Sequence, residues 1–114
     1  MSSSRTRKIE AEMQRVLSEL ISREVKDPRV GNVTITAIKL LSDMSSARVF
    51  FTPFASKNSP EDVQEGLTRA SGFLRGETGR RLGLRHAPKL EFEFDDTLDK
   101  AAALTALIDS TQRK

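Results

Sequence analysis

The segment RASGFLRGETGRRLGLRHAPK, residues 69–89, combines basic side chains with glycines. It carries six basic residues, one acidic residue and four glycines. Five of the six cations are arginines, whose planar guanidinium groups form forked hydrogen bonds with phosphate oxygens. This pattern favours an anionic partner such as a nucleic acid, and the alternative is an ordinary solvated helix face. The candidate phosphate contacts here are Arg69, Arg75, Arg80, Arg81, Arg85 and Lys89.

Further basic residues lie outside this segment. Arg5, Arg7 and Lys8 open a stretch with helical periodicity, at the helix end where the dipole disfavours cations. A role in binding would account for that placement, so we include them as weaker candidate contacts. Arg29 follows Pro28 in a turn that proline and glycine already explain, and it is a further candidate.

The composition excludes several kinds of site. The chain of 114 residues has no cysteine, which rules out disulfides and thiolate metal sites, and a single histidine, His86, cannot build a histidine-based zinc site. The paired carboxylates within residues 91–96 lack a histidine, lysine or glycine-rich phosphate loop at a supporting spacing. We therefore expect no catalysis, metal, cofactor or small-molecule substrate.

Length and hydropathy indicate the general class of protein. No segment approaches the ~18 apolar residues of a membrane span, and the N-terminus lacks the apolar stretch of a secretory signal. The net charge is only +3, so the basic excess in residues 69–89 is local. We expect a single monomeric, cytoplasmic domain over residues 1–114, away from membranes, with residues 1–4 as a flexible tail.

The first part of the chain predicts a helix and a hairpin. Seven apolar residues within residues 5–26 share one helical face, and Pro28 ends that helix. Residues 33–41 alternate as a strand and shift phase at Ile38, which indicates a β-bulge or a twist. A short polar turn leads to a second strand over residues 47–54, so the two strands should form an antiparallel hairpin.

The remaining sequence predicts two further helices, a third strand and a short final helix. Ser59 caps a helix that starts at Pro60, and a separate helix follows Ser71. Residues 89–94 alternate as a half-buried strand, and residues 97–112 form a short helix that docks on the core or serves a partner. The order α-β-β-α-α-β, plus the short helix, predicts an α+β fold with helices on one face of a three-stranded sheet.

Three short motifs carry a family resemblance. They are Asp27-Pro28-Arg29-Val30-Gly31, then Ala70-Ser71-Gly72-Phe73-Leu74-Arg75, then Pro88-Lys89-Leu90 with Phe92 and Asp95. In this order and spacing the chain resembles the bacterial ribosome-binding factor A family over roughly residues 5–108. The resemblance implies a type II KH-like fold. Longer members of the family carry an extended charged C-terminal tail that this sequence, ending at Lys114, does not contain, so the resemblance implies nothing about the function of such a tail here.

The same resemblance implies a function. It is binding to the immature small ribosomal subunit and help in maturing the ribosomal RNA, notably in the cold. A general RNA-binding module not tied to the ribosome is the alternative. Ala70, Ser71 and Gly72 would form a turn between two helices, where ordinary KH domains hold RNA backbone with a GXXG loop. Ser71 as a helix cap would leave N–H groups free for a phosphate; an ordinary capped kink is the alternative.

The glycines of this segment allow two explanations. Gly72, Gly76, Gly79 and Gly83 lie at i, i+4, i+7 and i+11, so on a helix they form one stripe. Each costs about 1 kcal/mol relative to alanine in a helix interior. The stripe either packs closely against the sheet or a neighbouring helix, or lets RNA backbone approach the main chain, above all at Gly72.

The aromatic residues predict how RNA would be recognised. The chain has six phenylalanines and no tryptophan or tyrosine. We expect Phe51, Phe92 and Phe94 in the core, whereas Glu91 and Glu93 point out from the third strand. An acidic outer sheet face would repel phosphate, so RNA should meet the helical side and be recognised by shape and backbone.

Overall fold

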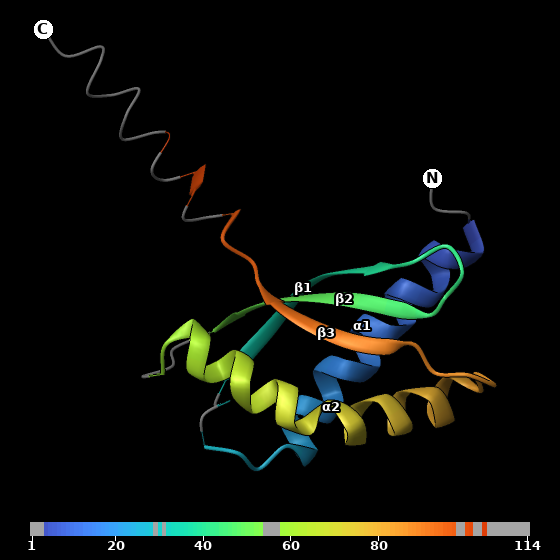
Figure 1. Cartoon of the computed structure of the whole chain (residues 1–114), viewed down its shortest axis with the longest axis horizontal. Helices are drawn as coiled ribbons and strands as arrows, with labels where there is room; N and C mark the ends of the chain where they lie inside the picture. Colours follow the sequence, from blue (N-terminus) through green and yellow to red (C-terminus); the bar gives the residue numbers. More distant parts are fainter. Residues whose placement is uncertain are drawn as a thin grey trace, which may run out of the picture.

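The computed structural model describes residues 4–28, 30, 32–53, 58–97, 100–101 and 104. The strands form one sheet in the order β1-β2-β3, and both helices lie on the same side of it (Figure 1). This confirms the predicted α+β class with helices on one face of a three-stranded sheet. The elements are α1 (Ser4–Glu24), β1 (Val33–Leu40), β2 (Ser46–Pro53), α2 (Pro60–Leu82) and β3 (Lys89–Phe94).

The sheet is mixed. β1 and β2 pair antiparallel, as the hairpin prediction required, and β2 pairs parallel with β3. The register between β1 and β2 shifts between Ile35 and Ala37, which confirms a bulge close to the predicted change of phase. The bulge keeps Ile35 and Ile38 on the same buried face, although two residues lie between them.

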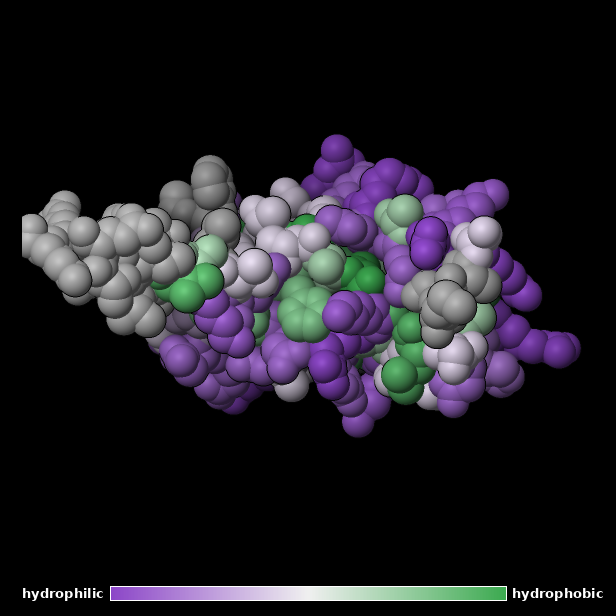
Figure 2. Space-filling model, turned by 90° about the horizontal axis from the view of Figure 1, so that it is seen from above, coloured by the Kyte–Doolittle hydropathy of each residue, from purple (hydrophilic) through white to green (hydrophobic). Residues whose placement is uncertain are grey.

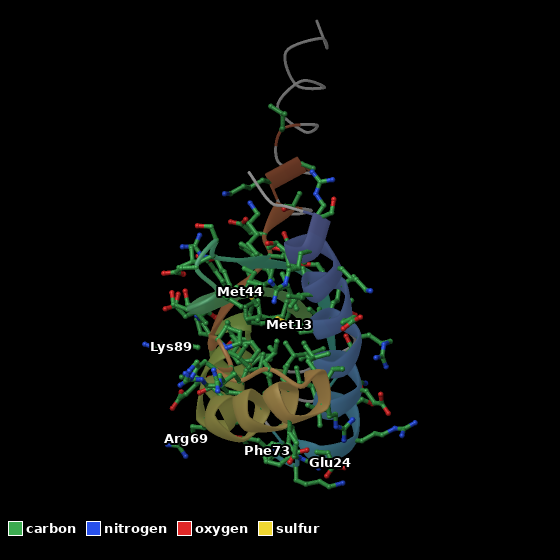
Figure 3. The ribbon with its side chains drawn as sticks, turned by 90° about the vertical axis from the view of Figure 1, so that its right-hand side faces the viewer. Met13, Glu24, Met44, Arg69, Phe73 and Lys89 are labelled. Carbon is green, nitrogen blue, oxygen red and sulfur yellow. The ribbon has the colours of Figure 1, made fainter. Side chains whose placement is uncertain are left out.

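One hydrophobic core lies between the sheet and the two helices. α1 contributes Met13 and Leu17, α2 contributes Leu67 and Leu74, and Phe51 from the central strand is fully buried among them. Figure 3 shows Met13 between α1 and the sheet. Burying each such side chain contributes about 1.5–3 kcal/mol, which fixes both helices against the sheet.

Side chains of the helices also bind the backbone of the edge strands. Gln14 Nε2 donates to Ile35 O at 2.9 Å, and Glu10 Oε2 accepts from Leu40 N at 2.8 Å. Gln64 Nε2 donates to the carbonyl oxygen of Phe92 at 2.8 Å. These bonds satisfy edge groups that no strand covers, and they hold the start of α1 beside β1.

The predicted division of the second half into two helices is wrong. α2 runs without interruption from Pro60 to Leu82. Its predicted cap is confirmed, because Ser59 Oγ accepts from Asp62 N at 3.2 Å. Leu67 and Leu74, two turns apart, are both fully buried, so the core holds one continuous helix through the intervening residues. Burial of these two side chains outweighs the roughly 1 kcal/mol that one glycine costs.

The structure describes only part of the two ends of the chain. α1 begins at Ser4, so this last residue of the predicted tail is helical. The predicted helix over residues 97–112 lies mostly outside the described residues. Lys100 N donates to Asp96 O at 2.9 Å, and the described Leu104 is 58% exposed. The docking of this segment stays a prediction.

Candidate nucleic-acid interface

Three of the predicted arginines line one groove. Arg5 comes from the first turn of α1, Arg75 from the middle of α2, and Arg85 from the connection between α2 and β3. The groove has a volume of about 500 Å³, and His86 lies in it beside these arginines. Among the described residues, neither Arg5 nor Arg85 forms an ion pair. Three guanidinium groups from α1, α2 and the connection to β3 therefore line one hollow, an arrangement suited to phosphate.

Arg75 is held in place by the main chain. Its Nε donates to Ala87 O at 3.0 Å, across the connection that returns the chain from α2 to β3. The terminal N–H groups of the guanidinium remain for a partner. Gly79 allows this arrangement, because a Cβ on that glycine would lie 2.8 Å from Ala87 Cβ. The packing of one glycine thus positions one arginine of the groove.

The opposite wall of the groove is the turn between β1 and β2. Asp43 Oδ1 accepts from Ser45 N at 3.0 Å and from Ser45 Oγ at 2.7 Å. These bonds, the backbone one first, hold the pKa of Asp43 below its ordinary value. Met44 takes a left-handed φ of 62° and packs against the core. From the sequence, these residues were predicted only as a polar turn, and His86 was noted only as the single histidine. No pattern in the nearby sequence indicates that they line the groove.

The four glycines of the stripe have three different structural roles. Gly79 packs against Ala87, and Gly83 ends α2 with a left-handed φ of 66°. A Cβ on Gly72 or Gly76 would meet nothing within 4 Å. Close packing is therefore wrong as the explanation for Gly72 and Gly76, both of which are exposed to solvent. Approach of RNA backbone at these two positions stays a prediction.

An exposed ridge of α2 contains these two bare positions. Arg69, Gly72, Gly76 and Arg80 follow one another at i, i+3, i+7 and i+11, which places them on one helix face. All four are exposed. We call this set the α2 ridge. It presents two arginines separated by about three turns, with no side chain at the two glycines between them.

The predicted phosphate site at a helix start near Ala70 is wrong. Ala70, Ser71 and Gly72 lie inside α2, where backbone N–H groups are engaged within the helix. Ser71 Oγ donates to Thr68 O at 2.6 Å and caps nothing. Ala70 is half-buried and packs against the core. Only Gly72 of the three residues is exposed, and it belongs to the α2 ridge.

The other predicted cations are distributed around the helical side. Arg80 pairs with Glu77 at 2.6 Å, and Arg81 lies 3.9 Å from the same carboxylate. Both guanidinium groups keep exposed donors, and such exposed pairs contribute at most about 1 kcal/mol. Arg7 and Lys8 are exposed on the first turns of α1.

Lys89 and Arg29 complete the predicted set. Lys89 N donates to Ser45 O at 3.0 Å, which places the start of β3 next to the groove wall. Its side chain is exposed and points away from the body of the molecule in Figure 3. Arg29 lies outside the described residues.

The outer face of the sheet is not acidic, contrary to the prediction. β1 and β2 bring Lys39 and Arg48 beside Glu91 and Glu93, and Arg48 Nε lies 3.4 Å from Glu93 Oε2. Lys39 Nζ lies 5.9 Å from the centre of the Phe50 ring. Figure 2 looks onto the sheet side, where apolar residues gather near the centre with hydrophilic residues around them. The alternation of acidic and apolar residues in β3 could not indicate the basic side chains that β1 and β2 place beside them.

Asp95, one of the paired carboxylates, has a structural role. Thr36 Oγ1 donates to Asp95 Oδ2 at 2.6 Å and Thr97 N donates to Asp95 Oδ1 at 2.9 Å. These bonds, that of Thr36 first, lower the pKa of Asp95 to about 2. The carboxylate ties the bulge of β1 to the end of β3. In the part of the chain that the structure describes, no cluster of three or more His, Cys, Asp or Glu could hold a metal ion.

Neither helix has the character of a membrane span. No helix among the described residues is both long and apolar enough to cross a bilayer.

Known proteins with similar sequences share one description. The family profile described as Ribosome-binding factor A matches residues 5–108. A relative of that name from Thioalkalivibrio sulfidiphilus is 50% identical over 106 residues, which cover 93% of this chain and 82% of the relative. Another, from Azoarcus sp., is 41% identical over 111 residues, with coverages of 97% and 88%.

Solved structures of the same description have the same fold. The crystal structure of ribosome-binding factor A from Thermus thermophilus aligns with a TM-score of 0.69 and 32% identity, covering 76% of this chain and 92% of that one. A homology model of the Thermus thermophilus factor, fitted into a cryo-electron microscopy map of its 30S complex, aligns with a TM-score of 0.64 and 30% identity, covering 78% and 93%. From the family profile, the relatives and the shared fold together, the chain belongs to the ribosome-binding factor A family.

Proposed function

We propose that this protein binds the small ribosomal subunit in the cytoplasm and, as a monomer, promotes maturation of the small-subunit ribosomal RNA without catalysing a reaction. Membership of the family supports subunit binding, since one related structure was fitted into a 30S complex. The observation that carries the proposal is the convergence of Arg5, Arg75 and Arg85 on one groove. That arrangement suits the folded backbone of an RNA, where phosphates from several nucleotides lie close together.

The groove supplies binding energy and little base selectivity. Guanidinium groups contact phosphates whatever the base, so they position the protein on RNA without specifying a sequence. Neutralising phosphates releases counterions, which makes such binding weaken as salt rises. The protein would therefore recognise the shape of folded ribosomal RNA, and isolated oligonucleotides of any sequence would bind the groove weakly.

The α2 ridge extends this contact surface. Gly72 and Gly76 leave the helix backbone bare, and Arg69 and Arg80 flank them. An RNA strand crossing the ridge would approach the helix more closely than side chains elsewhere on α2 allow. Arg69 and Arg80 would then reach phosphates on either side of the crossing.

Association with subunits tests the proposal directly. We expect the variant R5Q/R75Q/R85Q to lose co-sedimentation with purified immature small subunits, whereas the wild-type protein sediments with them. The matched control R15Q/R23Q/K100Q removes the same charge from exposed positions away from the groove and should sediment like the wild type. Circular dichroism of both variants would verify that they fold. Equal loss in both variants, or none in the first, would contradict the groove assignment.

Two further measurements separate the parts of the proposal. If the wild-type protein binds short oligonucleotides as tightly as it binds subunits, it is a general RNA-binding module. Promotion of maturation is tested by growing a deletion strain at low temperature with the wild-type or the groove variant. We expect precursor ribosomal RNA to accumulate with the groove variant and to be processed with the wild type.

A further inference from the structure

A second groove lies along residues 66–73 of α2, in the middle of that helix. It has a volume of about 300 Å³ and lies between α2 and the C-terminal end of α1. Phe73 borders it and is 48% exposed. Figure 3 shows Phe73 and Glu24 at the same end of the molecule, with the Arg69 side chain pointing outward. Its lining includes Gly66, Ala70 and Phe73 of α2 and the charged residues Glu24, Lys26, Asp27 and Arg69.

The exposure of Phe73 alone carries no argument, because single exposed apolar residues are common. Its surroundings are more specific. Gly66 and Ala70, which line the groove beside it, have little or no side chain, and half-buried Val25 adds an apolar surface. The result is a small apolar surface next to an accessible aromatic ring, in a groove that charged residues also line.

Charge is distributed unevenly around this groove. Arg69, one helical turn before Phe73, is exposed on the α2 ridge. Glu24 is the last residue of α1, and the final carbonyl groups of a helix lack partners within it. The α2 side of the groove therefore offers the cation Arg69, and the α1 side offers the Glu24 carboxylate and helix carbonyl oxygens, with Lys26 and Asp27 following Glu24. A whole nucleotide could use both sides, its base meeting the acceptors and its phosphate meeting a cation.

We infer that this groove takes an unstacked nucleobase that bears an exocyclic amino group. The base stacks on the ring of Phe73, its amino group donates to Glu24, and Arg69 contacts the adjoining phosphate. Stacking of single-stranded bases on aromatic rings is a general mode of RNA recognition, and carboxylates accept hydrogen bonds from the amino group of cytosine. Uracil has no such group. The inference rests on the proposed function and adds a base-selective subsite to it.

The first test uses the absence of tryptophan from this sequence. F73W introduces a single fluorophore at the groove, and L41W introduces one at a residue of similar exposure, 53%, beyond the end of β1. Both are titrated with oligocytidylate and with oligouridylate, and binding is followed independently by the anisotropy of labelled RNA. We expect oligocytidylate to quench F73W more strongly than oligouridylate does, and neither to quench L41W. Binding without quenching of F73W, or no binding of either oligonucleotide, would overturn the inference.

The second test measures affinity. F73A should weaken oligocytidylate binding roughly 5- to 150-fold, the range expected for losing one stacked base. This factor should be the same at low and high salt, because stacking releases no counterions. R69Q should instead reduce the salt slope by nearly 1. F73Y should restore binding, and F73L should not.

The third test addresses selectivity and the nature of the partner. E24Q should remove the preference for oligocytidylate over oligouridylate; an unchanged preference would overturn the role of Glu24. If F73A lost association with intact subunits while binding oligocytidylate normally, a ribosomal protein would occupy the groove and the inference would be wrong. Failure of the wild-type protein to sediment with subunits would contradict the proposed function instead, whatever the oligonucleotides show.

Discussion

The outer face of the sheet and the arginine groove both contain basic side chains, but in opposite situations. On the sheet, Arg48 faces Glu93 and Lys39 lies over Phe50. In the groove, Arg75 is held by a backbone carbonyl oxygen, and among the described residues Arg5 and Arg85 have no acidic partner within ion-pair distance. Cations on the sheet are balanced by neighbouring strands, whereas cations in the groove remain for an anion. Whether a basic residue remains available to bind an anion thus depends on its neighbours in the fold and not on how many basic residues the chain has.

Charge reversal in the groove and on the sheet should produce the largest difference in affinity for small subunits. R75E should weaken association with small subunits by about 10- to 150-fold, since a charged hydrogen bond contributes about 1.5–3 kcal/mol. R48E places a third acid beside Glu91 and Glu93 but removes no proposed contact, so its affinity should stay within about twofold, roughly 0.4 kcal/mol. Quantitative co-sedimentation measures both. Comparable losses in the two variants would mean that the sheet face also binds.

A pair of glycine substitutions tests how the helical side contributes to stability and to subunit binding. In G79A the new Cβ would lie 2.8 Å from Ala87 Cβ, so we expect a loss of about 1–3 kcal/mol in the free energy of unfolding. The shift of Ala87 should also release Arg75 and weaken subunit binding. Urea denaturation and co-sedimentation measure the two effects.

G76A is the matched control, because its Cβ meets nothing within 4 Å. It should raise the free energy of unfolding by up to about 1 kcal/mol through helix propensity. If RNA crosses the α2 ridge, this more stable protein should nevertheless bind subunits less well. Tighter or unchanged binding would show that the bare backbone at Gly76 is not approached.

The smallest expected effect concerns the carboxylate at the edge of the sheet. Hydrogen bonds from Thr36 and Thr97 lower the pKa of Asp95 to about 2 in the folded protein. A depressed folded pKa contributes stability above the unfolded pKa of about 3.9, and this contribution is lost as the pH falls towards 2. The variant D95N should lack that part of the pH dependence in urea denaturation between these values. A D95N curve parallel to that of the wild type would contradict the assigned bonds.

Local patterns in the sequence predicted much of the fold. The helical face before Pro28, the phase shift near Ile38 and the cap at Ser59 each reflect an interaction within a few residues, and the structure confirms all three. The continuity of α2 was missed because burial of Leu67 and Leu74 in a common core is a tertiary effect. The low helix propensity of glycine at Gly72 indicated a break in the helix, but burial of Leu67 and Leu74 keeps α2 continuous.

The sequence predicted basic residues of the candidate site but not their arrangement in space. Arg5, Arg75 and Arg85 were identified as cations, but their meeting in one groove depends on the pairing of β2 with β3 and on the packing of α1. The four glycines looked alike in the sequence, although Gly79 differs because Ala87 folds back onto it. Phe73 was identified only as part of a family motif, because the exposure of an aromatic residue on a helix cannot be predicted from spacing alone.

The salt dependence of subunit binding tests the central claim most directly. With about four phosphates engaged, the slope of log affinity against log salt should be near −3 to −4 for the wild-type protein. The slope for R5Q/R75Q/R85Q should be shallower by about 2 to 3, and that for R15Q/R23Q/K100Q should be unchanged. A flat dependence in the wild type, or equal slopes in all three proteins, would contradict binding through the arginine groove.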